Sequence, residues 1–336
     1  MMGKACYEVI SRRWYAPLVT LFFLLLNLAC GLIVMPDATT TVEQYRDVGA
    51  ALALPLISGV CIFFLPVVCR KASHAILESS RLSGSSMCQA QLHAGRIGVV
   101  PPESIYLAIV AGLVVAVSYL ALEGLLYFAD RDILYNLKRM PLVIESIYFW
   151  FAVMLLITTL VRITILLTRF ATRDLRIELF QIEELVPLSN SVLWNVGAIS
   201  AGLALMPIFW LGRAIPALDI PLMLAVVTVT LYILLYPVFQ VRKIVLRKKR
   251  LALERIRETF KSATRSDDQQ KRRLTDSAKR LEEINNLVGV RKEIARTKEW
   301  PISIPVGIRV AFFVVVPPLS WVAASLVDWL VTQMVS

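Results

Sequence analysis

Residues that could carry out catalysis or bind a metal are few in this sequence, and none stands in a recognisable motif. His74 and His93 are the only two histidines, and no ligand set at the spacing of the usual metal motifs accompanies them. The HExxH, GxSxG and P-loop patterns are absent. The sequence therefore predicts no catalytic residue, no metal site, no bound cofactor and no enzymatic activity.

The five cysteines do not indicate chemistry either. They stand at positions 6, 30, 61, 69 and 88 and form no CxxC pair. On the membrane orientation argued below, none of them falls in an outer loop. This distribution is typical of reduced thiols that serve only in packing.

Three carboxylates lie at the ends of apolar segments, where an acidic residue could have a function. Glu123, Glu145 and Asp328 fall at the predicted outer ends of such segments. An ionisable group is costly in hydrocarbon, and a side chain near the end of a span can reach the lipid headgroups instead. We favour that interpretation. The alternative is an outer vestibule in which the three carboxylates form an acidic ring that attracts cations.

The excess positive charge is concentrated in one segment. Residues 241–300 hold 19 Lys and Arg against 9 Asp and Glu, so they carry +10 of the formal net charge of +11. The densest run consists of Arg247, Lys248, Lys249 and Arg250. Each cation near an anionic leaflet contributes about 1 kcal/mol of attraction, so we predict that this run contacts lipid headgroups. A nucleic-acid partner is disfavoured, because Glu254 and Glu258 interrupt the patch and no nucleic-acid-binding motif is present.

Apolar helices must position these residues. A hydrophobic fraction of 57%, a charged fraction of 18% and a mean hydropathy of +0.66 are typical of a polytopic membrane protein. A span needs roughly 17 to 25 apolar residues to cross a hydrocarbon core about 30 Å thick. Seven segments meet this length: 15–35, 48–69, 104–128, 143–166, 191–212, 219–240 and 305–331. We therefore predict an all-α membrane bundle of about seven transmembrane helices. The first segment is longer than the usual core of a signal peptide, which favours a retained span.

The distribution of Lys and Arg predicts the orientation of the bundle. With a cytoplasmic N-terminus, the inner connections 1–14, 70–103, 169–190 and 241–300 hold 29 of these residues, and the outer connections hold 5. Positive residues accumulate on the cytoplasmic side. We therefore predict a plasma (inner) membrane protein with the C-terminus outside.

Small, polar and proline residues within the segments predict how the helices pack. Ala108, Gly112 and Ala116 stand four apart, a spacing that lets two helices approach closely. Asn27 lies well inside the first segment, where we expect an interhelical hydrogen bond. Prolines within the segments predict kinks, and Pro317 and Pro318 stand side by side in the middle of the seventh. A broken helix lining a cavity is the alternative interpretation of this pair.

The basic segment has a helical pattern of its own. Leu246, Leu253, Ile256, Phe260 and Ala263 follow a heptad-like spacing, and Leu274, Leu281, Ile284 and Val288 form a second such seam. The intervening "SATRSDDQQ" indicates a turn. We therefore predict an antiparallel, coiled-coil-like hairpin that returns the chain to the membrane. The predicted organisation is a membrane domain over 1–240, a basic cytoplasmic hairpin over 241–300 and a last membrane helix over 301–336.

Two functions from different classes fit these patterns, and no motif indicates a specific family. The first is a non-enzymatic membrane scaffold or sensor, whose hairpin binds a protein partner or a second copy of the chain through residues 241–300. The second is a channel or an uncoupled transporter with proline-kinked spans, gated by the hairpin. The other expected partner is a bilayer with anionic headgroups in its inner leaflet.

Overall fold

The computed structural model describes residues 14–33, 42–84, 86–122, 133–174, 186–210, 219–265 and 285–294, with a few isolated positions between 282 and 319. Over these residues every regular element is a helix, and none is a strand. The predicted all-α class is therefore confirmed.

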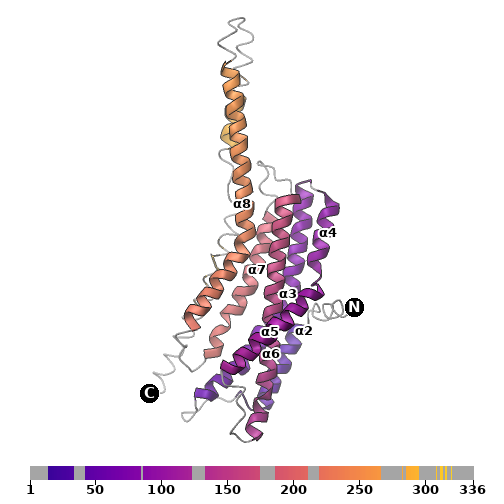
Figure 1. Ribbon diagram of the computed structural model, residues 1–336, viewed down its shortest axis with the longest axis vertical. Helices are drawn as coiled ribbons and strands as arrows, with labels where there is room; N and C mark the ends of the chain where they lie inside the picture. Colours follow the sequence, from indigo (N-terminus) through magenta and orange to yellow (C-terminus); the bar gives the residue numbers. More distant parts are fainter. Residues whose placement is uncertain are drawn as a thin grey trace.

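The helices form an elongated bundle from which one helix projects (Figure 1). In chain order they are α2 (Tyr15–Ala29), α3 (Val42–Leu82), α4 (Met87–Gly98), α5 (Pro102–Leu122), α6 (Ile133–Arg169), the π-helical turn η1 (Phe170–Asp174), α7 (Val186–Ala204), the 3₁₀ turn η3 (Met206–Trp210) and α8 (Asp219–Arg265). Helices α3 and α6 are central, because each packs against several of the others.

Four described segments are long and apolar enough to cross a membrane, and they coincide with the second to fifth predicted spans. They are Gln44–Leu82, Met87–Leu122, Lys138–Thr172 and Val186–Trp210. Helix α2, at the first predicted span, is apolar but shorter. The sixth predicted span lies in the first half of α8, where few side chains are described, and the seventh lies outside the described residues except for isolated positions. The long apolar helices are compatible with an integral membrane protein.

The connection predicted at 70–103 is largely helical. Helix α3 has 41 residues and is therefore about 60 Å long, twice the hydrocarbon thickness of a bilayer. Gly84, with φ at +59°, supplies the left-handed residue of the turn that follows. The Ser86 side chain then caps α4 by accepting a hydrogen bond from the Gln89 N–H. Helix α4 folds back along α3 and buries Ala90, Ala94 and Ile97.

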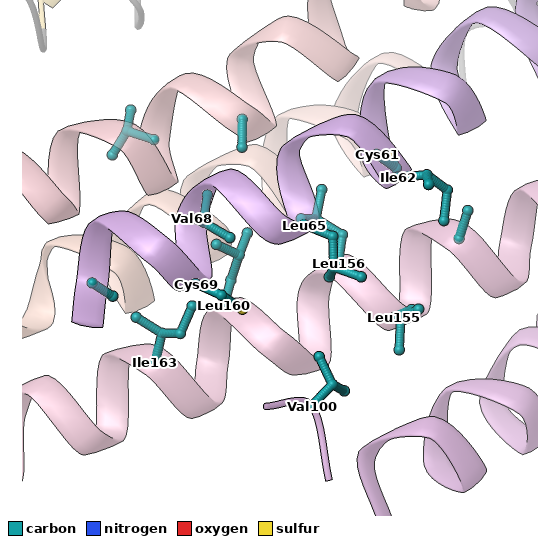
Figure 2. Packing of buried hydrophobic residues seen from close by; sticks show 14 of the residues in the cluster. Cys61, Ile62, Leu65, Val68, Cys69, Val100, Leu155, Leu156, Leu160 and Ile163 are labelled. Atoms are coloured by element: carbon teal, nitrogen blue, oxygen red, sulfur yellow. The ribbon is translucent and has the colours of Figure 1, made fainter. Parts of the chain in front are cut away.

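Apolar side chains fill the seam between α3 and α6. Figure 2 shows side chains of α3 facing those of α6 across this seam, and each of them is at most 4% exposed. They are Cys61, Ile62, Leu65, Val68 and Cys69 of α3, and Leu156, Leu160 and Ile163 of α6. This dense packing makes the two helices the structural axis of the bundle.

At Gly49 and Gly112, glycine allows a helix to approach the backbone of a neighbouring element. A Cβ added to Gly112 would lie 3.0 Å from the Cα and N of Phe151, so α5 approaches the backbone of α6 directly. Ala108 and Ala116 lie on the same buried face of α5. The predicted small-residue contact is therefore confirmed. A Cβ on Gly49 would lie 2.8 Å from the Phe209 carbonyl oxygen, so the absence of a side chain at Gly49 lets η3 pack closely on α3.

Helix α8 runs without interruption through the boundary predicted at residue 240. It has 47 residues and is therefore about 70 Å long. Its last part extends beyond the ends of α3 and α4 (Figure 1). The first limb of the predicted hairpin is thus helical to Arg265 and residues 285–294 are helical, whereas the turn between them lies outside the described residues. The hairpin itself stays a prediction.

Candidate functional site

Polar side chains are buried where α2, α3 and α6 meet, and we call this group the polar junction. It consists of Asn27 of α2, Arg46, Asp47 and the Ala51 carbonyl of α3, and Arg139 and Glu145 of α6. The sequence separations between these helices are large. The junction therefore exists only in the folded chain.

Pro55 creates one half of the junction. Proline has no backbone N–H, so the carbonyl four residues earlier, that of Ala51, has no donor within its own helix. The Asn27 side chain supplies that donor, since its Nδ2 lies 2.8 Å from the Ala51 carbonyl oxygen. The predicted interhelical hydrogen bond of Asn27 is confirmed. It compensates for a proline in the middle of α3.

Glu145 forms the other half. Asn27 Nδ2 also donates to Glu145 Oε2 at 2.9 Å, so one amide group joins three helices. Glu145 is only 1% exposed and Asn27 is fully buried. The expectation that Glu145 extends to the headgroups is therefore wrong. Helix α6 begins at Ile133, ten residues before the predicted span, and this places Glu145 about three turns inside it.

Two oxygen atoms of this pair are unsatisfied. Among the described residues, neither Glu145 Oε1 nor Asn27 Oδ1 has a hydrogen-bond partner, and both atoms are buried. Buried polar atoms in native proteins almost always have a partner. The two atoms are therefore the part of the junction that could bind a ligand.

The outer part of the junction is an ion network. Asp47 accepts hydrogen bonds from Arg46 at Oδ1, from Nε at 3.2 Å and from Nη2 at 3.0 Å. Its Oδ2 lies 2.5 Å from Arg139 Nη2 of α6. All three side chains are at most 14% exposed. The network ties α3 to α6 one turn from the Asn27 and Ala51 contact and leaves Asp47 fully engaged.

A second set of buried polar side chains lies on α7. Ser191 and Asn195 are one turn apart and at most 2% exposed. In the part of the chain described, neither the Ser191 hydroxyl nor either polar atom of the Asn195 amide has a hydrogen-bond partner. This set contains no ionisable group, so it is a weaker candidate than the polar junction.

The remaining predicted residues are placed unevenly. Arg247, Lys248 and Arg250 are exposed on α8, as headgroup contact requires, but Lys249 is 9% exposed and is directed toward protein. The predicted acidic vestibule stays untested, because two of its three carboxylates lie outside the described residues. The predicted kink in the seventh span also lies outside them. These residues are Glu123, Asp328, Pro317 and Pro318.

The structure adds little to the case for catalysis or metal binding. His74 Nδ1 lies 3.2 Å from Glu78 Oε2, a carboxylate one turn along α3, but both side chains are exposed. No group of three or more His, Cys, Asp or Glu that could hold a metal occurs within the described ranges. This pair alone does not make a site.

Sequence reasoning missed the partners of Glu145 and Asp47. One usable signal was present, because a lone Asn in one apolar segment and a Pro in the middle of the next indicate a free carbonyl and a donor for it. The pairing of Asp47 with Arg139 had no such signal. Arg139 contributed only to the count of outer Lys and Arg residues behind the predicted orientation, and Asp47 was given no role.

Comparison of the chain with protein families, curated proteins and solved structures finds no match.

Proposed function

We propose that the protein is a non-enzymatic membrane scaffold or sensor whose basic extramembrane segment, residues 241–300, binds a protein partner or a second copy of the chain. The observation that carries this proposal is the continuity of α8 from Asp219 to Arg265. One rigid helix joins the predicted sixth span to the segment that carries nearly all the excess charge.

The part of α8 that begins the basic segment, which we call the basic arm (residues 241–265), is anchored to the helix bundle. Helix α8 packs against α6, α7 and η1. Val245 is 1% exposed and belongs to the main apolar core, and Lys249 is 9% exposed. A shift of α6 would therefore move the base of the arm, and the unbroken helix would carry that movement outward. This coupling is what a sensor requires.

The outer part of the arm offers a binding face. Leu253 and Ile256 are half-buried, and six of the twelve residues from 250 to 261 are exposed and charged. An amphipathic helix with one apolar face and charged flanks is the usual element of helix-to-helix recognition. The exposed residues Arg247, Lys248 and Arg250 would at the same time hold the base of the arm near anionic headgroups.

The test replaces residues 250–296 with a flexible Gly-Ser linker in the full-length protein. Membrane insertion is first checked by the accessibility of Cys88, an exposed thiol. With the intact chain, we expect chemical cross-linking in native membranes to give an adduct with a partner protein or with a second copy of the chain. We expect this adduct to be absent from the linker variant. Retention of every adduct by the correctly inserted variant would overturn the proposal.

A second comparison tests whether binding depends on the apolar face of α8 and not only on its charge. Leu253→Ser with Ile256→Ser alters the half-buried seam, whereas Leu251→Ser alters a neighbouring side chain that is already 48% exposed. We expect the adduct to be lost only in the seam variant. Equal effects of the two variants would argue against a specific face.

A channel or uncoupled transporter is the second proposal, with the buried polar side chains of the bundle as its support. Asn27, Glu145 and Asn195 are each at most 1% exposed inside apolar helices, where polar groups often mark a pathway. The filled seam between α3 and α6 argues against an open pore along that seam. Ion flux into liposomes that contain the purified chain, compared with empty liposomes, separates the two proposals.

A further inference from the structure

The unsatisfied oxygens of the polar junction indicate a role separate from the proposed scaffold or sensor function, because they lie in the helix bundle and not in residues 241–300. Asn27 Nδ2 has two hydrogens, and the bonds to the Ala51 carbonyl and to Glu145 Oε2 use both. The remaining oxygen of each side chain, Asn27 Oδ1 and Glu145 Oε1, has no donor among the described residues. Both oxygens are acceptors, so a ligand must bring a hydrogen or a positive charge.

The charges around the pair do not supply what it lacks. Arg139 and Arg46 are held by the two oxygens of Asp47, and within the described part of the chain no ion pair to Glu145 is formed. A carboxylate that is 1% exposed and receives a single hydrogen bond would be left without compensation for its charge. Burial of such a charge is strongly unfavourable unless a counter-charge accompanies it.

We propose that Glu145 and Asn27 form a site for a small monovalent cation, either sodium or a proton. Carboxylate, amide and backbone carbonyl oxygens are the ligands that hard cations prefer, and the Ala51 carbonyl oxygen lies 2.8 Å from the Nδ2 atom of the same Asn27 amide. A proton would bind at Glu145 Oε1 and would neutralise the carboxylate directly. Because both ligands cancel the buried charge, both stabilise the folded bundle.

Other titratable groups lie on the elements packed around the pair. They include Tyr15 on α2 and Cys30 directly after it, Tyr45, Arg46, Asp47 and Cys61 on α3, and Arg139 and Tyr148 on α6. Helix α7 and η3 contribute none, because residues 186–210 contain no ionisable side chain. The experiment must therefore isolate the response of Glu145 from that of its neighbours, which a difference between variants achieves.

The experiment measures thermal unfolding of the purified full-length chain in detergent, for the wild type and for Glu145→Gln. In one arm sodium chloride replaces choline chloride at constant ionic strength and constant pH. In the other arm the pH is lowered in the absence of sodium. Glu103→Gln, which changes an exposed carboxylate at the start of α5, is the matched control.

A site for sodium predicts that the difference in melting temperature between wild type and Glu145→Gln grows with sodium, by about 5 °C at a hundred times the dissociation constant. A site for a proton predicts that the same difference grows as the pH falls. Mass action requires this sign, because the ligand binds the folded wild type and has no carboxylate to bind in the variant. Glu103→Gln should follow the wild type in both arms.

A difference that stays constant in both arms would overturn the proposal. If Glu145→Gln does not fold, Asn27→Ala replaces it, because this change keeps the carboxylate and removes the Oδ1 oxygen. The midpoint of the stabilising response should then move several-fold toward higher sodium or toward higher pH, the latter because the variant also removes the N–H that stabilises the charged carboxylate. An unchanged midpoint would equally contradict the site.

Discussion

At the scale of single residues, the polar junction shows how a proline can be accommodated deep inside an apolar helix. Pro55 removes a donor, and a side chain from another helix replaces it. The same amide also satisfies one oxygen of Glu145. Asn27 is therefore the residue that joins α2 to both α3 and α6 by hydrogen bonds.

This role of Asn27 predicts an energetic coupling with Pro55. Asn27→Leu leaves the Ala51 carbonyl and Glu145 without their donor, which should lower the unfolding free energy by about 2 to 4 kcal/mol. In a Pro55→Ala background the new N–H of residue 55 can bond the Ala51 carbonyl, so the cost of Asn27→Leu should fall by about 1 kcal/mol. Thermal or denaturant unfolding of the four proteins measures the coupling, and strictly additive effects would contradict this role.

The ion network predicts a second coupling. Asp47→Asn removes the carboxylate charge that the mostly buried Arg46 and Arg139 share, and we expect a loss of about 2 to 4 kcal/mol of unfolding free energy. Adding Arg139→Gln should restore part of that loss, because it removes one of the uncompensated charges. The same unfolding assay checks this prediction. A double variant less stable than the sum of the two single effects would show that the residues do not act as a pair.

At the scale of helices, the contact of α5 with α6 depends on the absence of a side chain at Gly112. In Gly112→Ala the new Cβ would lie 3.0 Å from backbone atoms of Phe151, which cannot move away as a flexible side chain can. We expect a loss of about 1 to 3 kcal/mol of unfolding free energy.

Gly202→Ala in α7 is the matched control for that change. Its Cβ would meet only the Ile57 Cγ2 atom, at 3.9 Å, an ordinary van der Waals distance. Alanine is the better helix former by about 1 kcal/mol, so this variant should be as stable as the wild type or more stable. Equal destabilisation by both substitutions would mean that the α5 contact is not specifically tight.

Individual helices were largely predictable from the sequence, and their neighbours were not. The apolar segments at the second to fifth predicted spans are helices in the structure, because the length of an apolar run is a local property. The stripe around Gly112 was also predictable, since spacing by four marks one face of a helix. By contrast, the start of α6 ten residues early, with Pro141 inside it, carries no apolar signal.

The polar junction was predictable only in part, for a physical reason. A single sequence shows that Asn27 needs a partner, but the identity of that partner depends on which helices are adjacent and at what depth. Glu145 was assigned to a span end because the predicted span begins at residue 143, whereas the helix itself begins at Ile133. The pairing of Asp47 with Arg139 likewise follows only once α3 and α6 are aligned.

At the scale of the whole molecule, the structure divides into a bundle packed on α3 and α6 and a long basic helix anchored to it. Arg162 illustrates how firmly the bundle end is organised, since it donates to the carbonyl oxygens of Arg96 and Val99 at the C-terminal end of α4. Such fixed ends favour rigid-body movements over local bending. In the proposed function, those movements reach the binding face through α8.

The most direct test of this account places a photoreactive amino acid on α8 of the full-length chain in native membranes. Separate variants carry it at positions 253 and 256 on the seam and at position 251 beside it, and mass spectrometry identifies the adducts. A scaffold or sensor predicts one and the same protein, partner or second copy, cross-linked at 253 and 256 and not at 251. Adducts with lipid alone, or equal protein adducts at all three positions, would contradict the proposed function of the arm.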